Sequence, residues 1–202
     1  DRLVDGADDE GEVGMFSEEA VVSIIFADLA GFTALSETMN PPEVTLMLNE
    51  IFARLTEAVF EFEGTVDKFI GDEMMVFFGA PISQEDHAER AVRCAIRMRE
   101  CLAEFNESRP DEPDLAMSIG INSGPVIVGD IGSPQRKDYT VIGDTVNTAK
   151  RIESQAAKGG KIVIGPATYS LVKDACSCEA LPPMDLKGKQ ERLQLYSLES
   201  SS

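Results

Sequence analysis

Two aspartates and one lysine lie at positions where a carboxylate could bind a metal ion and an ammonium could bind a ligand: Asp28, Asp72 and Lys68. Asp28 follows residues 21–27, VVSIIFA, a β-branched and apolar run that predicts a strand buried on both faces. Asp72 lies in a Gly-Asp step between the two apolar runs of residues 66–78, and this pattern predicts a β-hairpin. Lys68 lies inside the first of these runs, where a solvated turn does not explain a charge.

The surroundings of Asp28 suit both a metal ion and a phosphate. From Asp28 the chain continues through a small-residue turn, LAGFT, into a predicted helix. A carboxylate at a strand end can bind a metal, and the free backbone N–H groups of the following turn can bind phosphates. The alternative is that Asp28 only caps a helix, although Gly31 and Phe32 are unusual after a plain cap. For Asp72 the alternative is an ordinary solvated turn, in which Asp is common.

Two amphipathic helices are predicted to flank the hairpin. The first begins at Pro41 and ends at Gly64, with apolar residues at three- and four-residue steps. The second begins at Ser83 and carries an apolar stripe as far as Phe105. His87, the one histidine, is expected to be exposed in the first turn of this helix and to have a structural role.

The next part of the chain alternates between strands and polar turns. Residues 115–121 and 126–128 are predicted strands with a Ser-Gly-Pro turn between them. Residues 132–138, GSPQRKD, are predicted to be a solvated loop, and residues 139–142 a short strand.

A third helix is predicted over residues 145–157. Asn147 and Arg151 are four residues apart, so they lie on one face of it. A strand at residues 162–164, a short helix and a closing hairpin within residues 186–198 follow. The strand-helix-strand-strand-helix-strand order of the first two thirds predicts an α+β fold with a ferredoxin-like βαββαβ core and an extended antiparallel sheet.

Composition limits the kinds of partner. The chain has 202 residues, 43% of them apolar, which suits one globular domain. Its formal net charge is −18, which argues against nucleic acid and anionic membranes as partners. A polyanionic substrate would be repelled at long range, so its site needs local positive charge from metal ions, Lys68 and Arg151.

The ends of the chain differ from its middle. Residues 1–17 are acidic and aperiodic, which predicts a linker or disordered lead-in and an upstream regulatory domain; residues 18–199 form the folded domain and 200–202 a tail. We expect no membrane segment, because no apolar run is long enough. Four cysteines without C-x-x-C spacing indicate reduced thiols and a cytoplasmic location.

Four motifs together resemble the ordered signature of class III nucleotidyl cyclases. They are FADLAGFT (26–33), GTVDKFIGDEMM (64–75), GINSGPVIVGDIG (120–132) and YTVIGDTVNTAKRIE (139–153). The resemblance covers nearly the whole chain. It implies an adenylate cyclase that converts ATP to 3′,5′-cyclic AMP and pyrophosphate with two divalent cations, Mg²⁺ or Mn²⁺.

The resemblance assigns roles to residues of two sets. In the first set, Asp28 and Asp72 match the metal-binding positions, Leu29 would lend its backbone carbonyl, and the N–H groups of the next four residues would hold phosphates: Ala30, Gly31, Phe32 and Thr33.

The second set recognises the base and the reacting groups. Lys68 and Thr140 match the base-specificity positions, as a Lys-Thr pair of bacterial type in place of the commoner Lys-Asp pair, and adenine stays the favoured base. Arg151 matches the transition-state arginine and Asn147 the residue that orients the ribose. Lys187 matches a phosphate-binding lysine, with Lys189 as the alternative.

In this family the two sets of one site come from different subunits. A chain that carries both sets is therefore expected to form a homodimer with shared active sites. Two other functions stay open. A catalytically silent, nucleotide-binding or dimerising module would have the same fold. A diguanylate cyclase shares the core, but its GGDEF loop is only partly matched by residues 70–73.

Overall fold

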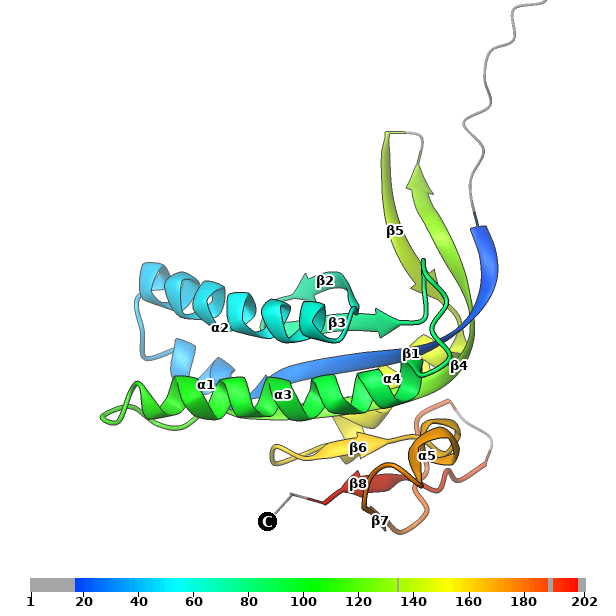
Figure 1. Ribbon diagram of the computed structural model, residues 1–202. Helices are drawn as coiled ribbons and strands as arrows, with labels where there is room; N and C mark the ends of the chain where they lie inside the picture. Colours follow the sequence, from blue (N-terminus) through cyan, green and yellow to red (C-terminus); the bar gives the residue numbers. More distant parts are fainter. Residues whose placement is uncertain (1–16, 134, 189–190, 200–202) are drawn as a thin grey trace, which may run out of the picture.

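One eight-stranded sheet organises the molecule, with helices on both faces (Figure 1). The computed structural model describes residues 17–133, 135–188 and 191–199. Along the sheet the strands run β2-β3-β1-β4-β6-β8-β7, and β5 pairs with β4. The strands are β1 (Ser17–Ala30), β2 (Thr65–Ile70), β3 (Glu73–Phe78), β4 (Ala116–Ser133), β5 (Arg136–Ile142), β6 (Ile162–Ile164), β7 (Cys178–Ala180) and β8 (Tyr196–Leu198). The helices are α1 (Phe32–Ser36), α2 (Pro41–Glu61), α3 (His87–Glu107), α4 (Asp144–Ala156) and α5 (Pro166–Val172).

The predicted ferredoxin-like core is confirmed. Its order is β1-α2-β2-β3-α3-β4, and the four strands lie antiparallel as β2-β3-β1-β4. The extension beyond β4 is mixed rather than antiparallel, because β6 pairs with β4 in parallel. The crossover through α4 explains this direction, since a parallel pair needs a long connection between its strands.

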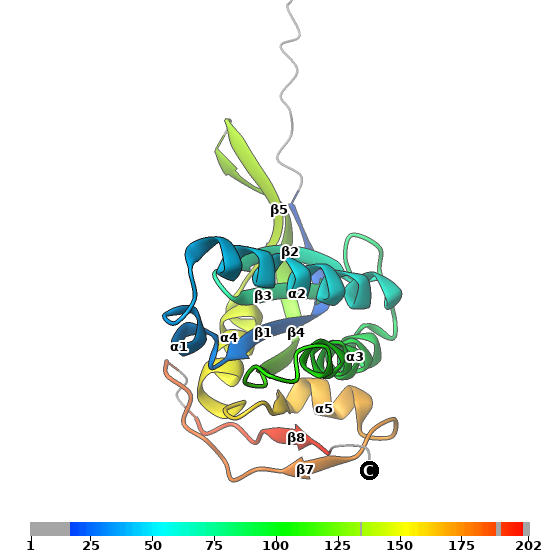
Figure 2. The same ribbon diagram turned by 90° about the vertical axis from the view of Figure 1, so that its left-hand side faces the viewer.

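Alternate side chains of β1 pack into two hydrophobic cores, one on each face of the sheet. Ile25 and Ala27 pack with α2 and α3, which lie side by side in Figure 2. Ile24 and Phe26 belong to the core under α4, on the opposite face of the sheet. This alternation fixes which strand residues can meet α4, because successive strand side chains point to opposite faces.

The expected turn at residues 123–125 is wrong. These residues continue β4 and pair with residues 21–23 of β1. A proline fits this strand because β6 pairs only with residues 119–121 and β5 only from Ile127 onward, so Pro125 lies at a locally free edge.

The expected solvated loop at residues 132–138 is also wrong. Gly132 pairs with Lys137 and Ser133 with Arg136, so β4 and β5 form a hairpin that projects from the body (Figure 1). We call its projecting part, residues 130–133 and 135–139, the arm. Most of these residues are exposed, so their sequence lacks the apolar alternation that marks a half-buried strand.

Two boundaries and one strand pairing differ from expectation. The second helix begins at His87 instead of Ser83, and the residue before it, Asp86, is its N-cap. The lead-in was expected to reach residue 17, but Ser17 already begins β1. In the closing hairpin β8 pairs with β7, which was not predicted, and Met184 forms an isolated bridge with Leu193. Residues 1–16 and the 200–202 tail lie outside the described residues.

His87 is buried, contrary to expectation. Its Nδ1 lies 2.8 Å from Oγ of Ser23, which lies 2.6 Å from Oγ of Ser123; Thr168 continues the chain of hydroxyls. Burial lowers the pKa of His87. These bonds link α3, β1, β4 and α5, which agrees with the predicted structural role. No helix within the described ranges is both long and apolar enough to cross a membrane.

Candidate active site

The sheet register brings the two predicted metal carboxylates together. Asp28 lies near the end of β1, opposite Glu73 of β3 and next to Asp72 in the hairpin turn. Asp28 shares the sheet face of Ile24 and Phe26, which is the face that α4 covers. Burial and then the charge of Asp72 raise the pKa of Asp28. The two carboxylates therefore repel one another in the absence of a cation.

This donor set fits a hard divalent cation. Carboxylate and carbonyl oxygens are the ligands that Mg²⁺ and Mn²⁺ accept, and a cation between Asp28 and Asp72 would remove their repulsion. Leu29 continues the buried strand beside Asp28. Within the parts of the chain that the structure describes, no three His, Cys, Asp or Glu side chains form a ready metal cluster. A cation there would depend on the aspartate pair, the Leu29 carbonyl, water and substrate oxygens.

The predicted phosphate turn leads from β1 into the short helix α1. Gly31 has φ 85°, in the left-handed region that favours glycine. Phe32 is buried in the main core and anchors the turn, whereas Thr33 is exposed. The first N–H groups of a helix have no partner inside it. The turn from Ala30 to Thr33 can therefore present donors beside Asp28.

A buried ion cluster beside the aspartates was not predicted. Nζ of Lys150 donates to Oε2 of Glu73 at 2.7 Å and to Oε2 of Glu153 at 2.6 Å. Glu73 is 7% and Glu153 4% exposed, and burial raises the pKa of both. Oε1 of Glu73 has no hydrogen-bond partner among the described residues. The three-residue spacing of Lys150 and Glu153 was the available signal, but nothing in the sequence linked them to Glu73.

Lys68 lies on β2 and pairs with Met75 of β3. Its side chain is 44% exposed, and its Nζ lies 3.1 Å from Oδ2 of Asp67. Thr140 lies on β5 opposite Gly129 and is buried. The rings of Tyr139 and Phe77 lie 6.4 Å apart, so the strand of Thr140 contacts β3, the neighbour of β2.

The predicted Asn147 and Arg151 both lie on α4 and take no part in the ion cluster. Asn147 is exposed, and a Cβ placed on Gly188 would lie 3.2 Å from Nη2 of Arg151. The N–H of Lys187 donates to Oε1 of Gln155 at 3.4 Å, on the same helix. The segment with Lys187 thus lies beside Arg151. The alternative, Lys189, lies outside the described residues.

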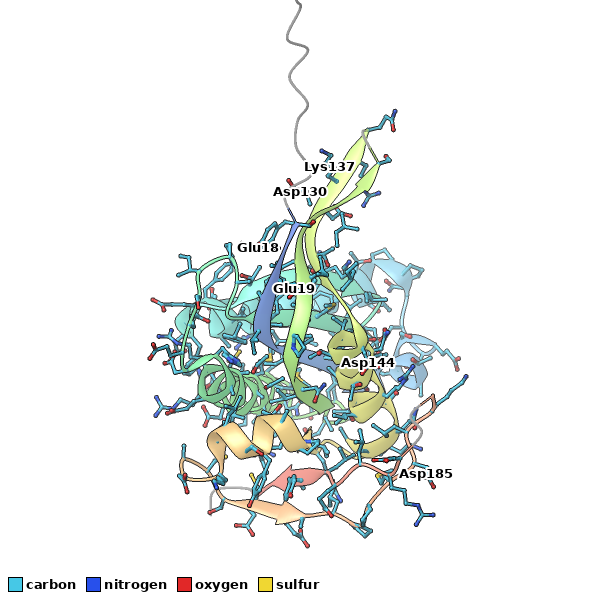
Figure 3. The ribbon with its side chains drawn as sticks, turned by 90° about the vertical axis from the view of Figure 1, so that its right-hand side faces the viewer. Glu18, Glu19, Asp130, Lys137, Asp144 and Asp185 are labelled. Carbon is cyan, nitrogen blue, oxygen red and sulfur yellow. The ribbon has the colours of Figure 1, made fainter. Side chains whose placement is uncertain are left out.

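Lys150 and Arg151 point to different sides of α4. At about 100° per residue, Arg151 lies roughly 100° round the helix from Lys150 and roughly 160° from Glu153, whereas Asn147 lies one turn from Lys150. Figure 3 shows α4 from the side of the arm, with Asp144 at its start and Asp185 on the segment below. In one chain the metal carboxylates therefore meet Lys150 rather than Arg151.

Two solved structures of nucleotidyl cyclases share this fold. The adenylyl cyclase CyaB from P. aeruginosa superposes with a TM-score of 0.86 at 35% identity, over 93% of this chain and 98% of that chain. The guanylyl cyclase Cya2 superposes with a TM-score of 0.86 at 38% identity, over 91% of this chain and 94% of that chain. The fold and the arrangement of site residues thus define a cyclase catalytic domain.

Residues 16–200 match the adenylate and guanylate cyclase catalytic domain, and the chain belongs to this class III cyclase family. It is 34% identical to Adenylate cyclase 1 of Rhizobium meliloti over 180 residues, which are 88% of this chain and 27% of that protein. It is 33% identical to the Adenylate cyclase of Anabaena cylindrica over 201 residues, 94% of this chain and 38% of that protein. The chain thus spans between 27% and 38% of the length of these two relatives.

Proposed function

We propose that this domain is an adenylate cyclase that converts ATP to 3′,5′-cyclic AMP and pyrophosphate at a site shared between two copies of the chain. One observation carries the proposal: one protomer holds a pair of aspartates, Asp28 and Asp72, and separately an Arg151-Lys187 group that α4 turns away from Lys150. Each is half of a phosphoryl-transfer site. A second copy would supply the missing half to each.

The chain's own residues provide alignment and charge. Phosphoryl transfer depends chiefly on positioning and on neutralising the phosphates. Two divalent cations bound by Asp28 and Asp72 would assist the attacking ribose 3′-oxygen and hold the leaving phosphates. Arg151 of the second copy would contact the α-phosphate as its charge grows, with its fixed fork of donors. Asn147 would hold the ribose, and Lys187 the phosphate tail.

Lys68 and Thr140 would select the base. An ammonium donates to adenine N1, which is an acceptor, and opposes the N1–H of guanine. The Thr140 hydroxyl can accept from the adenine amino group. A buried donor without an acceptor costs about 1–3 kcal/mol, so this pair favours ATP. Because adenylyl and guanylyl cyclases both superpose closely, the choice of base rests on these two residues.

Exposed apolar side chains at the base of the arm support a homodimer. Val21 lies beside Pro125, and Ile142 beside Ile127, and all but the partly buried Ile127 are exposed. We call these four residues the arm-base patch. Contiguous apolar surface of this kind marks interaction sites. An upstream regulatory domain and a cytoplasmic location remain part of the proposal.

The alternative is a silent cyclase-like module. Loss of a metal aspartate or of the α4 Asn-Arg pair would favour it, but Asp28, Asp72, Asn147 and Arg151 are all present. Asp72→Ala separates the two functions, because a cyclase loses turnover and a binding module keeps its function.

The test is product formation from ATP and from GTP, each with Mg²⁺ and with Mn²⁺, at two protein concentrations. The proposal predicts cyclic AMP, with a specific rate that rises with protein concentration. Cyclic GMP as the main product would contradict the base assignment. No cyclic nucleotide under any of these conditions would contradict the enzyme.

A further inference from the structure

A β-bulge places Lys68 on the face of the active site. Val66 pairs with Val76, but Lys68 pairs with Met75, so the register shifts by one residue between them. Without the shift Lys68 would oppose Met74, which packs in the core with α2. A one-residue shift moves a side chain to the other face of a sheet. The bulge thus turns Lys68 to the face that carries Met75 and Asp28.

The bulged residue, Asp67, has a buried carboxylate. Its side chain is 0% exposed, and neither carboxylate oxygen has a hydrogen-bond partner among the described residues. Nζ of Lys68 lies 3.1 Å from its Oδ2. Burying a carboxylate without hydrogen bonds is costly, and one that persists calls for an explanation. The adjacent ammonium of Lys68 accounts for it.

We infer that Asp67 is a positioning residue for base selection, acting through Lys68. The inference rests on the proposed role of Lys68 in contacting adenine. An ammonium has three N–H donors. Asp67 holds the ammonium at the bulge, while the 44% exposure of the Lys68 side chain leaves it accessible to a nucleotide. Without Asp67 the flexible four-carbon stem would sample many positions, and its preference for adenine would fall.

The test compares Asp67→Asn, which keeps the shape of the side chain and removes its charge, with Lys68→Met and the double variant. Two readouts are needed for each: kcat/KM for ATP and GTP, and calorimetric affinity for 3′-deoxy-ATP and 3′-deoxy-GTP, which lack the attacking hydroxyl. Asp86→Asn is the matched control, since Asp86 forms an ion pair with Arg90 at 2.7 Å outside the site. Asp67→Ser serves if the asparagine variant does not fold.

We expect Asp67→Asn to lower the ATP:GTP ratio about tenfold in both readouts, which is a difference of about 1.4 kcal/mol. It should have no further effect when Lys68 is already Met. Three results overturn the inference when the wild type prefers ATP. Asp67→Asn could weaken both nucleotides equally, it could leave the ATP:GTP ratio unchanged, or it could lower that ratio just as much when Lys68 is already Met. A wild type that binds or turns over neither nucleotide contradicts the proposed function as well.

Discussion

At the scale of single residues, Lys150 balances the charge of buried acids. It is one cation between two buried carboxylates, and Asp28 and Asp72 lie close enough to influence the same group. Removing one partner from a buried ion pair leaves charge without compensation, which costs about 3–5 kcal/mol in a fully buried setting. Lys150 is 41% exposed, so solvent reduces this cost.

Lys150→Met should therefore lower the free energy of unfolding by about 2 kcal/mol, a drop in Tm of about 4–8 °C for a domain of this size. Thermal unfolding of the metal-free protein measures it. The control is Lys158→Met, because Lys158 is exposed just beyond the same helix. Equal stability of the two variants would show that the cluster contributes nothing.

The raised pKa of Asp28 gives a pH dependence with a definite sign. A folded-state pKa above the unfolded value means that the folded protein binds the proton more tightly. The ordinary pKa of an Asp carboxyl is about 4. As the pH rises from there through the raised folded-state pKa, the Asp28 carboxyl lowers the free energy of unfolding by an increasing amount.

Asp28→Asn removes that cost. The Tm of the metal-free variant minus that of the wild type should increase between pH 4 and pH 7.5. Asp86→Asn should show the opposite trend, and at more acidic pH, below about pH 4, since hydrogen bonding to Arg90 lowers the pKa of Asp86. A difference for Asp28→Asn that is flat with pH would contradict the proposed repulsion.

Sequence reasoning identified most of the candidate site residues but not their neighbours. Asp28 and Lys68 were conspicuous because each is charged beside an apolar run. Glu73 and Asp67 were not, since their importance comes from register and from a bulge. These depend on which residues pair across strands, and one sequence does not encode that in its periodicity.

At the scale of elements, the packing of α4 on β4 positions Asn147 and Arg151. Gly120 of β4 lies against the backbone of α4. A Cβ there would lie 2.7 Å from the carbonyl oxygen of Ala149 and closer still to the backbone nitrogen of Glu153. Backbone atoms of a helix cannot move aside singly, so no larger residue fits.

Gly120→Ala should cost about 3 kcal/mol or more in the free energy of unfolding, measured with urea, and should abolish turnover. Ser118→Ala is the control, because it introduces the same residue two positions earlier on the same face of β4. A Gly120→Ala protein as stable as the control would contradict the close contact between β4 and the backbone of α4 at Gly120.

The elements that sequence reasoning missed share a physical cause. β7 is short and mostly exposed, so it lacks the apolar pattern of a half-buried strand. The long β4 contains Gly124 and Pro125, which locally favour a turn; the pairing of residues 116–129 with β1 overrides that preference. The strands and helices of the core were predictable because each buries one face in a regular period.

At the scale of the whole molecule, the proposed shared site requires a second copy of the chain. The arm, shown in Figure 3 with Asp130 and Lys137 labelled, extends beyond the body next to the exposed start of β1. Together with the arm-base patch it offers a surface for a second copy. An isologous dimer with twofold symmetry would create two equivalent sites.

The most direct test mixes two inactive chains. Asp28→Ala removes one half-site and Arg151→Ala the other, and each variant alone should form dimers without activity. We predict that the mixture regains cyclase activity, because each mixed dimer has one intact site; random pairing makes half of the dimers mixed, giving about a quarter of the wild-type rate per chain. A mixture that forms mixed dimers and stays inactive would contradict the shared site.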